Sequence, residues 1–205
     1  MLWQDLGGAT ILHVHLDSSI GGGKSTSMHL VADALLVLGV SGFTICDEPL
    51  HVWESRKLLT AMYTGVGPEA LALPSFQHVT LITRAAALSA CLGYPGVKLI
   101  LAERGIESDR HTFALLTHPS LGGPAPTAEA RAYAVTYEAV GQMLPLDGVL
   151  DINILLSVRP DVAMSRIVGR DRKAEGKVTV DFSRSLIDKY DSYYAGLLDR
   201  SPEDT

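Results

Sequence analysis

Short apolar stretches alternate along the chain with longer stretches whose apolar residues recur every three or four positions. The short stretches are rich in aliphatic and β-branched residues, and the one at 97–102 (VKLILA) is almost entirely apolar. Such a run is typical of a strand that is buried on both faces of a parallel sheet. We therefore predict four strands, at 10–16, 42–46, 97–102 and 149–158.

Helical periodicity fills the intervals between these strands. Gly93 follows one such stretch, as helix C-caps do, and Pro160 stands where a first helical turn tolerates proline. We predict a loop at 65–74 and helices at 25–39, 51–64, 75–92, 106–116 and 181–198, with two more that begin near 127 and 160. This alternation predicts an α/β fold, with a parallel sheet of four to five strands flanked by helices, in one domain over residues 1–205.

Composition then excludes several classes of protein. The chain has 205 residues, of which 47% are hydrophobic and 20% charged, so a mostly disordered protein is excluded. The net charge of −6 gives no general attraction to nucleic acid, and no nucleic-acid partner is expected. No secretory signal and no apolar run of membrane-spanning length are apparent, so we expect a cytoplasmic protein without a membrane partner. Cys46 and Cys91 lie in apolar runs and are expected to be buried thiols.

A glycine-rich segment joins the first predicted strand to the first predicted helix. Residues 18–25 (SSIGGGKS) match the phosphate-binding pattern GxxxxGK[ST], except that Ser18 replaces the first glycine. In this pattern backbone N–H groups cradle a phosphate, Lys24 contacts the β- and γ-phosphates, and Ser25 binds Mg²⁺. The alternative is a glycine-rich turn without a ligand. The motif predicts a nucleoside triphosphate site but leaves the reaction open, because several classes of enzyme share it.

Further segments of the sequence narrow the range of reactions that the protein could catalyse. Residues 47–53 (DEPLHVW) resemble the EP…W motif of the deoxyribonucleoside kinases, which include deoxycytidine and deoxyguanosine kinases and herpesviral thymidine kinases. Similar pieces follow in the family's order, namely Phe76-Gln77, Glu103-Arg104 and an SDR segment at 108–110. The resemblance covers about residues 10–198. It implies a P-loop kinase fold with an arginine-rich lid at about 166–178, which uses ATP and Mg²⁺ to phosphorylate a deoxyribonucleoside at its 5′-hydroxyl.

The resemblance also assigns the acceptor side of the site. Glu48 follows the second strand, at the carboxyl edge of the sheet, and would be the general base for the 5′-hydroxyl. An acid at the start of a helix is the alternative. Arg84 would hold Asp109, whose carboxylate would accept a hydrogen bond from the amino group of cytosine or adenine. Core packing and solvated helix positions are the alternatives for the remaining substrate-binding residues, which would be Trp53, Tyr63, Phe76, Gln77, Phe113 and Glu175.

The resemblance also assigns the phosphate-binding side of the site. Arg104 would act in catalysis with Lys24 and Glu48, and Glu103 would share the metal with Ser25. Gly105 comes next, where the family usually has serine. A surface ion pair or a solvated charged face is the alternative for the charged residues. The residues that bind ATP would be Ser19, Ile20, Gly21, Gly22, Gly23, Lys24, Ser25, Thr26, Arg166, Arg170 and Arg172.

Three other expectations concern features outside this site. His13 and His15 lie two apart on one side of a strand, but no third metal ligand is evident, so ordinary buried histidines are expected. The family pairs through helices, so we expect a homodimer, with residues 79–92 either at that surface or in the core. The family usually carries a fifth strand after the last helix, whereas only residues 199–205 follow that helix here.

Two other functions remain as alternatives to a deoxyribonucleoside kinase. The first is a nucleoside monophosphate kinase of the thymidylate type, which shares the phosphate-binding loop and the lid. Glu48 disfavours it, because a phosphorylated acceptor would more naturally meet a cation there. The second is an inactive nucleotide-binding relative, which the presence of Lys24, Glu48 and Arg104 opposes.

Overall fold

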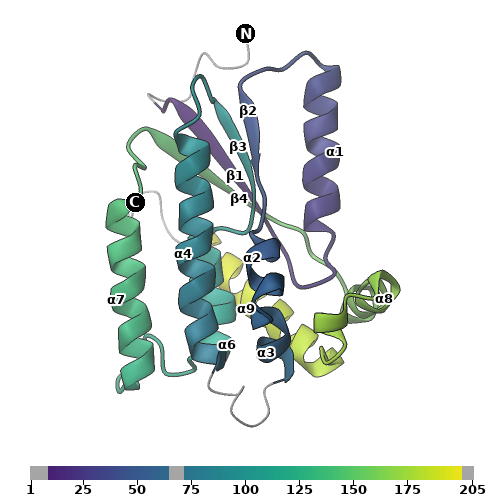
Figure 1. Cartoon of the computed structure of the whole chain (residues 1–205), viewed down its shortest axis with the longest axis vertical. Helices are drawn as coiled ribbons and strands as arrows, with labels where there is room; N and C mark the ends of the chain where they lie inside the picture. The colour runs from purple at the N-terminus through teal and green to yellow at the C-terminus, as the bar shows by residue number, and fades with distance from the viewer. Residues whose placement is uncertain (1–8, 65–71, 200–205) are drawn as a thin grey trace.

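A parallel sheet forms the centre of the protein in the computed structural model, which describes residues 9–64 and 72–199 (Figure 1). Its neighbouring strands run in the order β2-β3-β1-β4, and every pair is parallel. The register places Leu12 of β1 between Leu99 and Leu150. The strands are β1 (Ile11–Asp17), β2 (Phe43–Cys46), β3 (Leu99–Glu103) and β4 (Val149–Leu155). The predicted α/β class and parallel sheet are thus confirmed.

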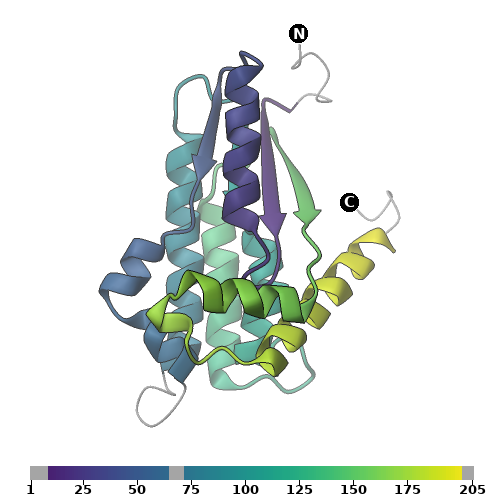
Figure 2. The ribbon, with the colours of Figure 1, turned by 90° about the vertical axis from the view of Figure 1, so that its right-hand side faces the viewer.

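Helices follow the strands along the chain and cover both faces of the sheet. The helical segments are α1 (Lys24–Val37), α2 (Leu50–Ser55), α3 (Leu58–Thr64), α4 (Ala72–Leu92), α5 (Ile106–Asp109), the π-helical turn η2 (Arg110–Ala114), α6 (Leu115–Thr117), α7 (Ala128–Met143), α8 (Pro160–Arg170), the 3₁₀ turn η3 (Lys173–Glu175) and α9 (Val180–Leu198). Figures 1 and 2 show α1 on one face, α4 and α7 on the other, and α8 and α9 beyond the carboxyl ends of the strands.

The core lies between these layers because strand side chains alternate between the two faces of the sheet. On one face Met28 of α1 packs against Leu101, and on the other Leu88 and Cys91 of α4 pack against Ile100. All five residues of β3 are buried, as its apolar run predicts. The expectation of buried, free thiols at both cysteines is confirmed.

Several element boundaries differ from those predicted. The helix expected at 51–64 is two helices, because Lys57 adopts a left-handed φ of 57° and interrupts the hydrogen-bond ladder. The strand expected to reach residue 158 ends at Leu155. The helix expected at 106–116 contains the π-helical turn η2. α4 begins at Ala72, three residues before the expected start, and the rest of the loop expected at 65–74 lies outside the described residues.

The strand β4 forms one edge of the sheet in the described part of the chain. Leu150, Ile152 and Ile154 are each about two-fifths exposed, so the apolar side chains of this strand are only partly covered. The fifth strand that the resemblance implies is not among residues 9–64 and 72–199. In this described portion no helix has the length and apolar character needed to cross a membrane.

Candidate active site

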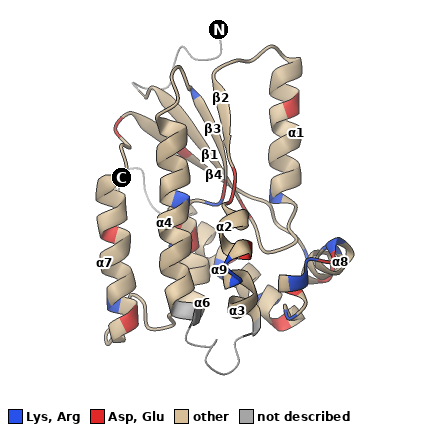
Figure 3. Cartoon of the chain, viewed as in Figure 1, with Lys and Arg blue, Asp and Glu red and all other residues tan. Residues whose placement is uncertain are grey.

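A cleft of about 530 Å³ opens where the carboxyl ends of the strands meet α2, α4 and α8. This volume is in the range of sites for small molecules, and the carboxyl edge is where open α/β sheets bind ligands. Figure 3 shows charged residues of both signs gathered at this end of the sheet. The cleft is lined by every site residue predicted from the sequence except Ser19.

The glycine loop forms one wall of the cleft and leads directly into α1. Gly21 and Gly23 have left-handed φ angles of 75° and 94°, which favour glycine. A Cβ at position 21 would lie 2.4 Å from the carbonyl oxygen of Ala163 in α8, so glycine also allows α8 to approach the loop. α1 begins at Lys24, and its N-terminus therefore faces the loop as a phosphate site requires.

Ser18, the departure from the phosphate-binding pattern, has a structural explanation. Its backbone is not in the left-handed region, so this position does not require glycine. The Ser18 hydroxyl donates to the carbonyl oxygen of Leu156 at 2.6 Å, which fastens the loop to the end of β4. Gly22 accommodates this hydroxyl, because a Cβ at position 22 would lie 1.8 Å from it.

Lys24 is buried at the base of the loop. Its ammonium donates to the carbonyl oxygens of Ser18 at 3.2 Å and Ser19 at 3.1 Å. Burial and the nearby Arg104 lower the pKa of Lys24 to about 7, although carboxylates around it act in the opposite direction. The free site therefore holds a lysine whose charge depends on pH near neutrality.

Ser25 and Glu103 bring two oxygen ligands together at the loop. The Ser25 hydroxyl donates to the Glu103 carboxylate, and Glu103 is buried at the end of β3. Hydroxyl and carboxylate oxygens are hard ligands of the kind that Mg²⁺ prefers. These two residues thus fit a magnesium ion.

Glu48 lies between two arginines. One of its carboxylate oxygens, Oε1, accepts hydrogen bonds from Arg84 and, at 2.7 Å, from Arg104. Burial raises the pKa of Glu48, but Arg104, Arg84 and then Lys24 outweigh burial and lower it to about 2. The carboxylate is therefore ionised at neutral pH. Arg104 itself has a left-handed φ of 62° and lies 4.5 Å over the Phe113 ring.

Arg84 links this carboxylate to the far end of the cleft. Its Nη1 lies 2.7 Å from Asp109 Oδ1, so the structure brings together the pair that the resemblance implies. The contact of Arg84 with Glu48 was not predicted, because the sequence gives no information about which residue after β2 lies against α4. Arg84 thus couples the residue expected to recognise the base to the residue expected to bind the hydroxyl.

Buried aromatic and amide side chains form the walls beside this pair. Trp53 and Phe76 have ring centroids 5.5 Å apart and planes at 80°, and the Trp53 indole donates to Thr83 at 3.0 Å. Gln77 is 1% exposed, and its side-chain oxygen accepts a 3.5 Å hydrogen bond from Thr80. Both rings also belong to the hydrophobic core, which confirms the core-packing interpretation, and their role in substrate binding stays a prediction.

The predicted lid residues lie at the opposite wall. Glu175 is 4% exposed and accepts two hydrogen bonds from Arg170, at 2.6 and 2.7 Å, and one from Arg172 at 3.0 Å. Arg166 donates to the carbonyl oxygen of Gly21 at 3.4 Å. Burial, with Glu175 next, raises the pKa of Tyr63, which therefore stays neutral beside this cluster.

Asp17 is a buried residue that the sequence analysis missed. It ends β1 directly before the loop and accepts hydrogen bonds from Ser108 and from Tyr194, each at 2.8 Å. The signal was present in the sequence, because an aspartate at the end of a buried strand needs partners. Asp17 does not itself line the cleft; the lining residues that were not predicted are Ser27, Leu50, Leu59, Met62 and Thr80.

The parallel sheet, the glycine loop before α1 and the cationic cleft together define a P-loop kinase fold. The model of the deoxynucleoside kinase family matches residues 14–202, and the chain belongs to this family. A probable deoxycytidine kinase of fowlpox virus (strain NVSL) is 26% identical over 180 residues, which cover 88% of this chain and 70% of that protein. The resemblance predicted from the motifs is thus confirmed, and the protein is a kinase of the nucleoside class.

Proposed function

We propose that this kinase transfers the γ-phosphoryl group of ATP to the 5′-hydroxyl of a deoxyribonucleoside. The observation that carries the proposal is that Glu48 and Lys24 line the same cleft, so that a hydroxyl acceptor beside Glu48 would lie near a phosphate donor beside Lys24. Family membership and the phosphate-binding loop support it.

On the donor side, the glycine loop and Lys24 would hold the triphosphate. Ser25 and Glu103 would hold Mg²⁺, which neutralises charge on the β- and γ-phosphates when bound. Arg166, Arg170 and Arg172 would meet the charge on the transferred group. Arg170 and Arg172 already contact Glu175, so the incoming phosphate would share arginines that this carboxylate holds in place.

On the acceptor side, Glu48 would accept a hydrogen bond from the 5′-hydroxyl and then its proton. With a pKa of about 2, Glu48 is a weak base in the free protein. Weak basicity suffices in a loose transition state, because bond formation to the nucleophile lags, little positive charge develops on the hydroxyl oxygen, and its proton is transferred late. Arg104, which donates to Glu48, would stabilise charge at the reacting oxygen.

The base would lie between Trp53 and Phe76, with Gln77 and Asp109 at its polar edge. Asp109, held by Arg84, can only accept hydrogen bonds, so it favours the amino group of cytosine or adenine over the carbonyl of thymine. The fowlpox relative, described as a probable deoxycytidine kinase, supports this preference. An unpaired acceptor facing the carboxylate would cost about 1–3 kcal/mol, which corresponds to about 5–150-fold in kcat/KM.

The test is a comparison of acceptors with ATP and Mg²⁺. The four natural deoxynucleosides and thymidine 5′-monophosphate are supplied separately, and the products are identified by chromatography. We expect 5′-monophosphates, with deoxycytidine or a purine deoxynucleoside preferred over thymidine. Turnover of thymidine 5′-monophosphate alone would instead show a monophosphate kinase, and ATP binding without any turnover would show an inactive relative.

The preference for the base is tested separately with Asp109→Asn. The single substitution is sharper than removal of Arg84, because Arg84 also binds Glu48. We expect the ratio of kcat/KM for deoxycytidine to that for thymidine to fall by about 5–150-fold. An unchanged ratio, or thymidine as the best substrate of the unmodified protein, would refute the role of Asp109.

A further inference from the structure

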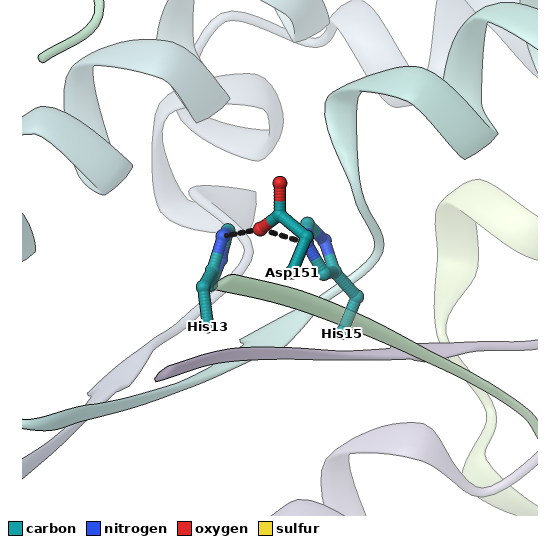
Figure 4. A group of neighbouring side chains, drawn as sticks. All are labelled: His13, His15 and Asp151. Carbon is teal, nitrogen blue, oxygen red and sulfur yellow. Dashed lines mark hydrogen bonds and ion pairs between the residues drawn. The ribbon is translucent and has the colours of Figure 1, made fainter. Parts of the chain in front are cut away.

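Three side chains outside the cleft come together on one face of the sheet. His13 and His15 project from β1, and Asp151 lies directly opposite His13 on the neighbouring strand β4. Figure 4 shows the two imidazole rings on either side of the Asp151 carboxylate, with both dashed lines ending on the same oxygen. None of the three residues lines the cleft that holds the candidate active site.

The geometry of this cluster is that of converging ligands. His13 Nδ1 lies 2.8 Å and His15 Nε2 lies 3.1 Å from Asp151 Oδ1. The three ligand atoms all lie within 4.8 Å of one another. Ligands placed tetrahedrally at the Zn²⁺–N distance of 2.0–2.1 Å are about 3.3 Å apart, so small side-chain movements would admit an ion.

Both histidines of this cluster are buried and close to each other. His13 and His15 are 3% and 7% exposed, and their ring centroids are 3.9 Å apart. Their other ring nitrogens, His13 Nε2 and His15 Nδ1, have no hydrogen-bond partner among the described residues. Asp151 is thus the one polar side chain in that part of the structure that orients both rings.

Gly105 provides the space for one of these rings. A Cβ at position 105 would lie 2.6 Å from His15 Nδ1, although the φ of −80° at Gly105 suits any residue. The glycine is therefore explained by the proximity of the imidazole and not by its backbone. The serine that the resemblance implies at this position would displace His15.

We propose that His13, His15 and Asp151 bind a divalent transition-metal ion of the zinc class. Two imidazoles and one carboxylate form a borderline ligand set that suits Zn²⁺ or Co²⁺, unlike the hard oxygen pair of Ser25 and Glu103. The Asp151 side chain is 48% exposed, so water has access to a fourth coordination position. The ion would join the edge strand β4 to β1 and stabilise the sheet. The expected burial of both histidines is confirmed, and Asp151 is the third candidate ligand that was not evident in the sequence.

The experiment is a Zn²⁺ titration of the untagged protein, with excess Mg²⁺ present to occupy hard oxygen sites. Calorimetry should give one equivalent of Zn²⁺, and the Tm should rise by about 5–10 °C at a hundredfold excess over Kd. Asp151→Asn and His13→Gln should each weaken binding by at least about tenfold. Asp151→Asn is the decisive variant, because the exposed side chain is not needed for packing.

The matched control is His111→Gln, since His111 also lies 2.9 Å from a carboxylate, Glu107, but without a second histidine. This variant should bind Zn²⁺ as the unmodified protein does. Substitution of Co²⁺ provides a second measurement, in which ligand-field bands without a thiolate charge-transfer band are expected. Failure of the unmodified protein to bind Zn²⁺, equal binding by Asp151→Asn, or a thiolate band from Co²⁺ would each overturn the proposal.

Discussion

Lys24 shows how the chemistry of a single residue depends on its surroundings. Burial and the nearby Arg104 give it a pKa of about 7, well below the ordinary lysine value of 10.5. A bound phosphate would supply a close negative charge and raise this pKa again. Nucleotide binding should therefore be coupled to proton uptake.

The first prediction is that the affinity for ATP falls as the pH rises above about 7. Below its pKa in the free protein, Lys24 is already protonated and contributes its full share of the affinity for ATP. As the pH rises from this value toward the higher pKa of the complex, ATP binding must take up a proton and the affinity falls. We expect a fall of up to about tenfold per pH unit, with proton uptake detectable by calorimetry in buffers of different ionisation enthalpy.

The control for this prediction is Lys24→Arg, whose guanidinium stays charged throughout this pH range. The variant should bind ATP without proton uptake at this position. A pH-independent affinity of the unmodified protein between about pH 7.5 and 9, where ATP itself has finished titrating, would contradict the lowered pKa of Lys24.

At the scale of the element, α8 and the glycine loop depend on each other. Gly21 has a left-handed φ, and a Cβ there would lie 2.4 Å from the carbonyl oxygen of Ala163 in α8, whereas Gly169 within α8 has open space around it. The structure therefore requires glycine at position 21 but not at position 169, so the two positions can be compared in one experiment.

The second prediction is that alanine has opposite effects at these two glycines. Gly21→Ala should lower the Tm by about 2–8 °C and weaken ATP binding, because the backbone is strained and α8 must move. Gly169→Ala should raise the Tm by about 1–4 °C, because helical alanine loses less entropy on folding. Thermal unfolding of both variants decides this, and a stabilised Gly21→Ala would contradict the packing of α8 on the loop.

The elements themselves were largely predictable, because each apolar run or helical periodicity is a local signal. Local signals do not mark the break at Lys57, where a polar residue takes a left-handed conformation within an apparently continuous helix. They also do not mark contacts across the sheet. Asp151 joins His13 only through the register of β4 with β1, and Glu48 meets Arg84 only through the packing of α4 on the sheet.

At the scale of the whole molecule, the sheet brings residues from distant segments, which we propose bind the donor and the acceptor, into one cleft. The residues that line this cleft could be predicted from the sequence motifs, and every predicted site residue except Ser19 lines it. The homodimer remains a prediction. Leu81 and Leu88 of the helical segment 79–92 lie in the core, and Ile82, which is 51% exposed, is the exposed large apolar residue of this segment.

The measurement that tests the central claim most directly is the single-turnover rate of phosphoryl transfer to the preferred deoxynucleoside in Glu48→Gln. The substitution keeps the size of the side chain but removes the charge that accepts the proton. We predict a rate lower by about 10²–10⁴-fold with the nucleoside still bound, and an unchanged rate in the control Glu138→Gln on the exposed face of α7. An unchanged transfer rate in Glu48→Gln, with only KM raised, would contradict the account, because Glu48 would then only position the substrate.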